Sequence, residues 1–268
     1  MSEAVQQSLG YQVDPRADVS ASAKIGAGSS IGAWAVVGDD VALGENSRVL
    51  PHATVLGPSR FGRDNVFYSY CAVGGDPQDL TFAGERTSLE VGDANTFREY
   101  VTVSRGTSKG GGVTRIGSRN LFMVHSHIGH DSQVGNNTIF VNGATLAGHV
   151  VVEDYATIGF FTPVHQFCRI GRYAYIGASS VITQDVAPFS KVVTKRDTQS
   201  YGVNKIGLER QGFTAARLDA IEQAFRLLLR SKLNTSQALE RMRETLSGSQ
   251  DVQQLIAFIA SAERGLTK

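Results

Sequence analysis

The sequence has little cysteine, little net charge and no long apolar run. Its two cysteines, Cys71 and Cys168, are far apart and form no CxxC pair, so a reduced, cytoplasmic setting is expected. A formal net charge of +1 indicates no nucleic-acid partner. No stretch approaches the ~20 apolar residues that span a bilayer, and the N-terminus has no signal-peptide pattern. We therefore expect no integral membrane segment.

The sequence is rich in glycine, with 29 residues, and it has an apolar residue at every sixth position. Steps of six over residues 13–73, 91–103 and 116–182 meet twenty-six positions, and each carries an aliphatic residue or Phe. Two interruptions, residues 75–90 and 104–115, separate these three runs. Such self-similarity at a fixed period is typical of a repeat protein.

A strict period of six does not fit an α-helix, whose apolar stripe recurs every 3.6 residues. Short strands that each turn one apolar side chain inward, and then bend at small or polar residues, fit it well. Three hexapeptides make a coil of eighteen residues, so the repeats make roughly nine coils. We predict a mainly β fold, a parallel β-helix over residues 1–190, with the interruptions as two projecting loops. The signature resembles the left-handed β-helix family, which implies the left hand.

The repeat stops after about Pro188, and residues 191–268 are predicted to form a small C-terminal helical domain. Apolar residues at helical spacing predict a helix over residues 214–230, with Thr214 as its N-cap. Two more helices are expected within residues 236–246 and 250–264. Their apolar stripes are expected to pack against one another and against the end of the β-helix.

Three histidines are predicted to lie along one edge of the β-helix. His130, His149 and His165 are 19 and 16 residues apart, close to the eighteen residues of one coil. Asp131 follows His130 directly, and His149 falls almost over it. Three histidines on one edge beside a carboxylate indicate a functional site.

Two chemistries fit this edge. In one, His130 is a general base whose tautomer is fixed by Asp131. In the other, histidines bind zinc, because His125 and His130 have the ligand spacing of the β-helical carbonic anhydrases, which complete the site across a trimer interface. His125 and His127 are expected nearer the middle of a strand. A non-catalytic scaffold is the third alternative, and it requires no such edge.

Several strings of the sequence carry a closer resemblance: "HIGHDSQVGNNTIFVNGATLAGHV" from 127, "PVHQFCRIG" from 163, "GVNKIGLERQGF" from 202, "PQDLTFAGERT" from 77, "VTVSRGT" from 101 and "GGGVTRIGS" from 110. They resemble the UDP-N-acetylglucosamine O-acyltransferase family of lipid A biosynthesis. The resemblance covers essentially the whole chain. A related N-acyltransferase family carries an additional N-terminal domain, for which a repeat that begins at Val13 leaves no room.

The resemblance implies an enzyme that transfers a 3-hydroxyacyl chain from acyl carrier protein to the 3-hydroxyl of UDP-N-acetylglucosamine, the first step of lipid A biosynthesis. It implies a homotrimer, no metal and no cofactor. His130 matches the general base, Asp131 its acidic partner, and the Gly148 N–H the oxyanion donor. The acidic carrier protein is expected to dock on basic residues of the terminal helices: Arg226, Arg230, Lys232, Arg241 and Arg243.

The same resemblance assigns residues to substrate binding. Those matching the sugar and acyl groove are Asp79, His127, His149 and Gln166, with Ala178 at the end of the acyl groove; those matching nucleotide contacts are His165, Asn204 and Arg210. A larger residue than alanine at position 178 would block a long chain, so Ala178 argues against a very short acyl group.

Four positions depart from the family pattern. Thr81 stands where a substrate-contacting lysine is familiar, which removes a cation near the first loop. Ile206 replaces an acidic residue, Gln211 an arginine and His125 an asparagine. None of these changes removes the expected base. They bear on how strongly the nucleotide is bound.

Overall fold

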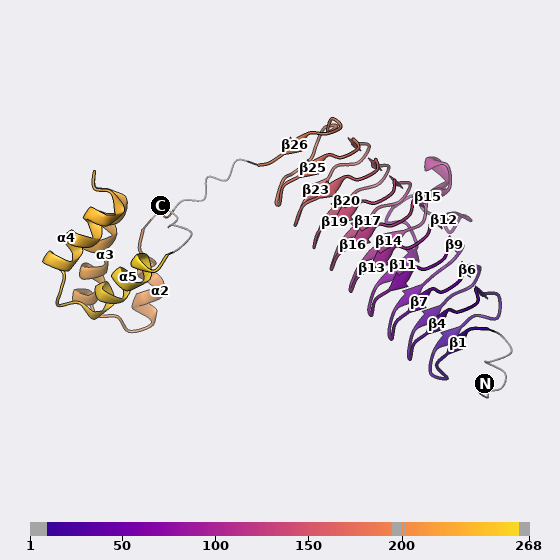
Figure 1. Ribbon diagram of the computed structural model, residues 1–268, viewed down its shortest axis with the longest axis horizontal. Helices are drawn as coiled ribbons and strands as arrows, with labels where there is room; N and C mark the ends of the chain where they lie inside the picture. Colours follow the sequence, from indigo (N-terminus) through magenta and orange to yellow (C-terminus); the bar gives the residue numbers. More distant parts are fainter. Residues whose placement is uncertain (1–9, 195–199, 201, 263–268) are drawn as a thin grey trace. The chain divides into compact units, whose positions relative to one another are not determined.

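The computed structural model describes residues 10–194, 200 and 202–262. The chain divides into two compact units, residues 1–194 and 195–268. Figure 1 shows the first as a stack of short strands and the second as a group of helices. Residues 1–9, where a signal peptide would begin, lie outside the described residues. So do residues 263 and 264, the last two expected in the third helix.

The first unit is a left-handed parallel β-helix built from three sheets, as the sequence predicts. Each coil gives one short strand to each sheet, and strands of successive coils pair in parallel. The pairs are eighteen residues apart in regular coils, as for Phe122 with Phe140. The first sheet contains β1 Gln12–Val13, β4 Ser30–Ile31, β7 Arg48–Val49, β10 Val66–Phe67, β13 Thr96–Phe97, β16 Leu121–Phe122, β19 Ile139–Phe140, β22 Thr157–Ile158, β25 Tyr175–Ile176 and β26 Lys191–Val192.

The other two sheets have eight strands each. The second sheet contains β2 Asp18–Val19, β5 Val36–Val37, β8 Thr54–Val55, β11 Ala72–Gly75, β14 Thr102–Ser104, β17 His127–Ile128, β20 Thr145–Leu146 and β23 Pro163–Val164. The third contains β3 Lys24–Ile25, β6 Val41–Leu43, β9 Ser59–Phe61, β12 Ser88–Val91, β15 Val113–Ile116, β18 Gln133–Val134, β21 Val151–Val152 and β24 Arg169–Ile170.

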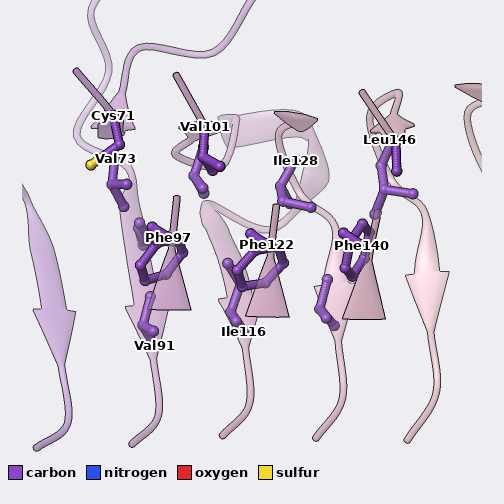
Figure 2. Packing of buried hydrophobic residues seen from close by; sticks show 14 of the residues in the cluster. Cys71, Val73, Val91, Phe97, Val101, Ile116, Phe122, Ile128, Phe140 and Leu146 are labelled. Carbon is purple, nitrogen blue, oxygen red and sulfur yellow. The ribbon is translucent and has the colours of Figure 1, made fainter. Parts of the chain in front are cut away.

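The apolar position of each hexapeptide points into the β-helix, where identical positions stack coil upon coil. The rings of Phe67, Phe97 and Phe122 stack with centroids 5.2 and 5.0 Å apart, and Phe140 continues the row at 5.0 Å. Figure 2 shows Phe97, Phe122 and Phe140 in successive coils. All four rings are fully buried. Each such burial contributes about 1.5–3 kcal/mol, so the repeat of apolar residues stabilises the fold directly.

Most turns use a left-handed backbone conformation at the third residue after the apolar position. At successive turns after the second sheet this residue is Asp131, His149 and Phe167, with φ of 59°, 62° and 66°. Residues other than glycine adopt this conformation infrequently. Because the turns stack, the side chains at this position form a row along each edge of the β-helix.

The β-helix continues past Ile182, where the six-residue pattern ends. Val186 forms a bridge with Ile170, and β26 pairs Val192 with Ile176. The sequence placed the end of the repeat at about Pro188, and β26, Lys191–Val192, follows it as the last strand of the β-helix. Val186 follows Ile182 by four residues instead of six, so a fixed step of six misses the last two inward positions.

Two loops interrupt the coils. The first loop, residues 76–87, joins β11 to β12, and strands that flank it pair thirty residues apart, as Phe67 with Phe97. The second loop, residues 105–112, joins β14 to β15 and contains the short 3₁₀ turn η1, Ser108–Gly110, which projects beside β15 in Figure 1. Strands across it pair twenty-five residues apart, as Phe97 with Phe122.

The second unit contains four helices among its described residues: α2 Lys205–Arg210, α3 Ala215–Leu229, α4 Thr235–Thr245 and α5 Gln250–Ala260. Thr214 caps α3 as predicted, and Asn234 and Ser249 cap α4 and α5. The last three helices share an apolar core. None of the described helices is long and apolar enough to cross a membrane.

Helix α2 was not predicted. It has only six residues, and Gly207 inside it lowers its intrinsic propensity to form a helix. The side chain of Asn204 accepts a hydrogen bond from the Gly207 N–H and so starts the helix.

Candidate active site

The candidate site is centred on the turn that follows β17. His130 Nδ1 lies 2.8 Å from Asp131 Oδ2, and the two side chains are 16% and 1% exposed. A carboxylate accepts hydrogen bonds, so the Nδ1–H donates and the neutral ring keeps its lone pair on Nε2. The arrangement is that of a base held in one tautomer by a buried acceptor.

The second loop holds the Asp131 carboxylate in place. The Thr107 N–H donates to Asp131 Oδ1 at 2.8 Å, and the Thr107 hydroxyl donates to Oδ2 at 2.7 Å. The Asp131 N–H donates to the Thr114 hydroxyl at 2.8 Å. A Cβ on Gly110 would lie 2.0 Å from Asp131 Cγ, so only glycine allows the loop to pack this closely.

Thr107, Gly110 and Thr114 were not identified as site residues from the sequence. The sequence showed only that an interruption of the repeat contains them. The length of the interruption predicts a projecting loop, but it does not tell which side chain that loop covers.

Gly148 lies against the ring of His130. A Cβ at position 148 would be 2.5 Å from His130 Cε1 and 2.7 Å from Nε2, so a larger residue would displace the base. The Gly148 N–H donates to no acceptor in the described part of the chain. An unpaired backbone donor therefore lies beside the lone pair of His130.

His149 lies close to both His130 and Asp131. Its ring packs edge-on against His130 with centroids 5.2 Å apart, and its Nε2 lies 3.7 Å from Asp131 Oδ2. Phe167, one coil further on, stacks on His149 at 4.6 Å and is 63% exposed. Phe167 was not singled out from the sequence, although a step of eighteen from His149 reaches it.

His127 lies in β17 and shares a 2.7 Å hydrogen bond between its Nδ1 and the Thr102 hydroxyl. Burial lowers the pKa of His127 below its usual 6.5, and the charge of His130 lowers it further. His127 is therefore neutral at pH 7.

The first loop contributes Asp79. Its Oδ1 accepts hydrogen bonds from the N–H and the hydroxyl of Thr81, at 2.8 and 2.9 Å. These bonds lower the pKa of Asp79, and the charges of Lys109 and His130 lower it further. Asp79 is thus an ionised group within electrostatic reach of the base.

The zinc alternative paired His125 with His130, and the structure separates them. His125 lies at the turn after the first sheet, with φ of 61°, and stacks on Tyr100 at 4.9 Å. It is not near the middle of a strand as expected, whereas His127 is in one. His125 and His130 therefore lie on different edges of the β-helix, because five residues carry the backbone from one edge to the next.

Ligand atoms of His130, Asp131 and His149 do lie within 4.8 Å of one another. However, His130 Nδ1 and Asp131 Oδ2 are only 2.8 Å apart. Two ligands of a tetrahedral zinc, each at ~2.0–2.1 Å from the metal, lie more than ~3 Å from each other. The observed distance is that of a hydrogen bond between the two side chains.

The remaining predicted residues lie elsewhere. His165 and Gln166 are exposed beside Phe167, and His165 Nδ1 lies 3.0 Å from the Gln166 carbonyl oxygen. Ala178 follows β25 of the first sheet, so it lies on a different edge from His130. Asn204 and Arg210 belong to α2 in the second unit, where Arg210 is exposed in the last turn.

Comparisons with known proteins first identify the class of transferase to which the chain belongs. Residues 13–57 match the model of the bacterial transferase hexapeptide with six repeats, so fold and repeat place the chain among hexapeptide transferases. Residues 185–267 match a second model, described as UDP-N-acetylglucosamine O-acyltransferase, domain 2.

Individual relatives and solved structures then identify the family within this class. An acyl-[acyl-carrier-protein]–UDP-N-acetylglucosamine O-acyltransferase from Stenotrophomonas maltophilia is 47% identical over 77% of this chain and 79% of its own. One from Alkalilimnicola ehrlichii is 47% identical over 74% and 77%. The UDP-N-acetylglucosamine acyltransferase structure from Francisella novicida has a TM-score of 0.67 and 34% identity, covering 95% and 93% of the two chains. The chain belongs to the UDP-N-acetylglucosamine O-acyltransferase family.

Proposed function

We propose that this chain transfers a 3-hydroxyacyl group from acyl carrier protein to the 3-hydroxyl of UDP-N-acetylglucosamine, the first step of lipid A biosynthesis. Relatives of the chain carry the name of the acyl transfer reaction. The observation that carries the mechanism is the 2.8 Å contact between His130 Nδ1 and the buried Asp131 carboxylate. It leaves His130 Nε2 as the proton acceptor.

In the proposed reaction, His130 Nε2 takes the proton of the sugar 3-hydroxyl as the oxygen attacks the thioester carbonyl carbon. The carbon–oxygen bond forms, and the carbonyl π electrons move to oxygen to give a tetrahedral oxyanion. The carbon–sulfur bond then breaks, and the protonated His130 returns the proton to the departing sulfur. Asp131 stabilises the transient imidazolium charge without taking its proton.

The Gly148 N–H supports the oxyanion step. It has no acceptor in the described part of the chain, and a Cβ on the same residue would lie 2.7 Å from His130 Nε2. A fixed donor of this kind acts on charge that develops only in the transition state, and one such donor contributes about 10²–10³ in rate.

The other groove residues keep the roles that the family resemblance suggests. Asp79, His127, His149 and Gln166 would contact the sugar and acyl groups, and His165, Asn204 and Arg210 the nucleotide. Asp79, His127 and His149 are supported by their positions around the base. Ala178 would line the end of the acyl groove.

Acyl carrier protein is acidic, and the helical unit offers it a basic surface. Arg226, Arg230 and Arg241 line one cleft of about 490 Å³ together with apolar Leu227 and Leu246. We propose this cleft as the centre of the carrier-protein contact, with Lys232 and Arg243 outside it.

We also propose a homotrimer, which sedimentation of the purified protein would test.

The reaction is tested by incubating chelator-treated protein with UDP-N-acetylglucosamine and a series of 3-hydroxyacyl carrier proteins of different chain length. Mass spectrometry of the nucleotide sugars identifies the product. A 3-O-acylated product supports the proposal and gives the chain length. No product with any donor contradicts it, whereas a product that forms only after zinc is added contradicts the metal-free mechanism.

A further inference from the structure

Lys109 is an exposed cation at the candidate active site that the mechanism above does not use. It lies in the 3₁₀ turn of the second loop, and its Nζ donates to the Thr81 hydroxyl of the first loop at 2.8 Å. An ammonium group has three N–H donors, so two remain for a ligand. The hydroxyl of Thr81 in turn donates to Asp79, so the three side chains form a chain that joins the two loops.

The position of Lys109 is fixed relative to the base. Thr107, two residues before it, binds both oxygens of Asp131, and Gly110, directly after it, packs against the same carboxylate. Thr107 also caps the turn, since its hydroxyl accepts from the Gly110 N–H at 3.1 Å. The backbone on both sides of Lys109 is thus attached to the residue that orients His130.

Lys109 differs from the other cations of the two loops in having no carboxylate partner. Arg105 is buried and forms an ion pair with Asp76, and Arg86 forms one with Asp40. Within the described residues, Lys109 forms no ion pair: its Nζ donates to the neutral Thr81 hydroxyl, and its charge acts on Asp79 only through space. Its charge is therefore available to an anionic ligand.

We propose that Lys109 binds the diphosphate of the nucleotide sugar and is a specificity-determining residue for the acceptor; this rests on the proposed function. The acceptor carries its diphosphate at C1 and its reacting hydroxyl at C3 of the same ring. A cation on the loop that holds Asp131 can therefore reach the diphosphate while the 3-hydroxyl meets His130. A lysine suits this role, since its ammonium binds phosphate oxygens as a point charge.

The test measures binding and turnover separately in the full-length protein. Lys109→Gln removes the charge, and we expect the Kd and the KM for UDP-N-acetylglucosamine to rise about tenfold or more, as for loss of a hydrogen bond to a charged group. The kcat should stay within about twofold of the unchanged protein. The matched control is Lys24→Gln, at an exposed lysine of β3 at the far end of its sheet, which should change none of these values.

Two further variants separate charge from loop structure. Lys109→Arg should keep most of the affinity, and Thr81→Lys added to Lys109→Gln should restore part of it by presenting an ammonium from the opposite loop. The affinity for methyl N-acetylglucosaminide, which has no diphosphate, should not respond to Lys109→Gln.

Failure of the Lys109 proposal can be told apart from failure of the proposed reaction, because calorimetry measures nucleotide-sugar binding without turnover. If the unchanged protein binds the nucleotide sugar but forms no product, the reaction fails while Lys109 remains testable by Kd. An unchanged Kd in Lys109→Gln overturns the proposal. So does a fall in kcat at constant Kd, which would show that Lys109 only holds the loops together.

Discussion

Two edges of the β-helix use the same turn geometry for different purposes. At the turn after the first sheet, His52, Tyr70, Tyr100 and His125 stack with ring centroids 5.2, 5.5 and 4.9 Å apart. At the turn after the second sheet, the same position is occupied by Asp131, His149 and Phe167. All of these residues have φ near 60°, so the backbone does not distinguish the two rows.

The difference is in what covers each row. Tyr70 and Tyr100 are about half exposed, at 53% and 49%, and contact mainly their neighbours in the row. Asp131 is buried under the second loop and accepts two hydrogen bonds from Thr107. The regular coils therefore supply rows of side chains on their edges, and an inserted loop buries and holds one member of the second row, Asp131.

His130→Ala should have the largest effect, because it removes the base without disturbing the buried core. We expect kcat to fall by about 10²–10⁴, the usual contribution of a positioned general base. The measurement is the initial rate at saturating substrates, with circular dichroism as a check of folding. A variant that keeps more than a tenth of the rate would contradict the role of His130.

Gly148→Ala should have the next largest effect. Its Cβ would lie 2.5 Å from His130 Cε1, so the base must move away from the oxyanion donor. We expect a loss of about 10² in kcat, comparable to the loss of one oxyanion-hole donor. Gly38→Ala is the control, since its Cβ first meets the flexible end of Leu56 at 3.2 Å and should leave the rate unchanged.

Thr107→Val removes the hydroxyl that binds Asp131 Oδ2 while keeping the side-chain shape. The hydroxyl also accepts from the Gly110 N–H, so two hydrogen bonds are lost. The one to the carboxylate, worth about 1.5–3 kcal/mol, should reduce kcat by about tenfold or more, because His130 is then less well oriented. Thr107→Ser, which keeps the hydroxyl, should retain most of the rate. Equal rates in the two variants would show that the loop does not act through this bond.

His127 should make stability depend on pH. Burial lowers its pKa in the folded state, so the unfolded chain binds more protons as the pH falls below 6.5. Its contribution to stability is therefore complete above pH 6.5 and decreases as the pH falls towards the folded-state pKa. Thermal unfolding at pH 7.5 and 5.5 should show a smaller decrease for His127→Gln than for the unchanged protein. Equal decreases would contradict this assignment.

Tyr100→Ala tests the other edge and should have the smallest effect on function. It removes two stacked contacts from an exposed row, so we expect a loss of about 1 kcal/mol in the free energy of unfolding. The acyl-transfer rate should stay within about twofold, as measured alongside denaturant unfolding. A large loss of rate with normal stability would show that this edge also takes part in the reaction.

Much of the fold could be predicted because its rules are local. A step of six locates the inward residues of the coils, and Thr214 marks the start of α3. The same rules failed where spacing or propensity changed, at Val186 after a step of four and at α2 with its internal Gly207. His125 was misplaced because position within a hexapeptide, rather than distance from His130, decides which edge a residue occupies.

The sequence by itself determined the β-helix, the last three helices and the pair His130–Asp131, because a repeat and adjacent residues need no knowledge of distant parts of the chain. The tertiary structure decided that Asp131 is buried and bound by Thr107, that Gly148 lies against the base, and that Lys109 reaches Thr81. These contacts join residues 18 to 28 positions apart. They depend on where two irregular loops fold back onto the coils, and packing decides that path because the loops have no repeat of their own.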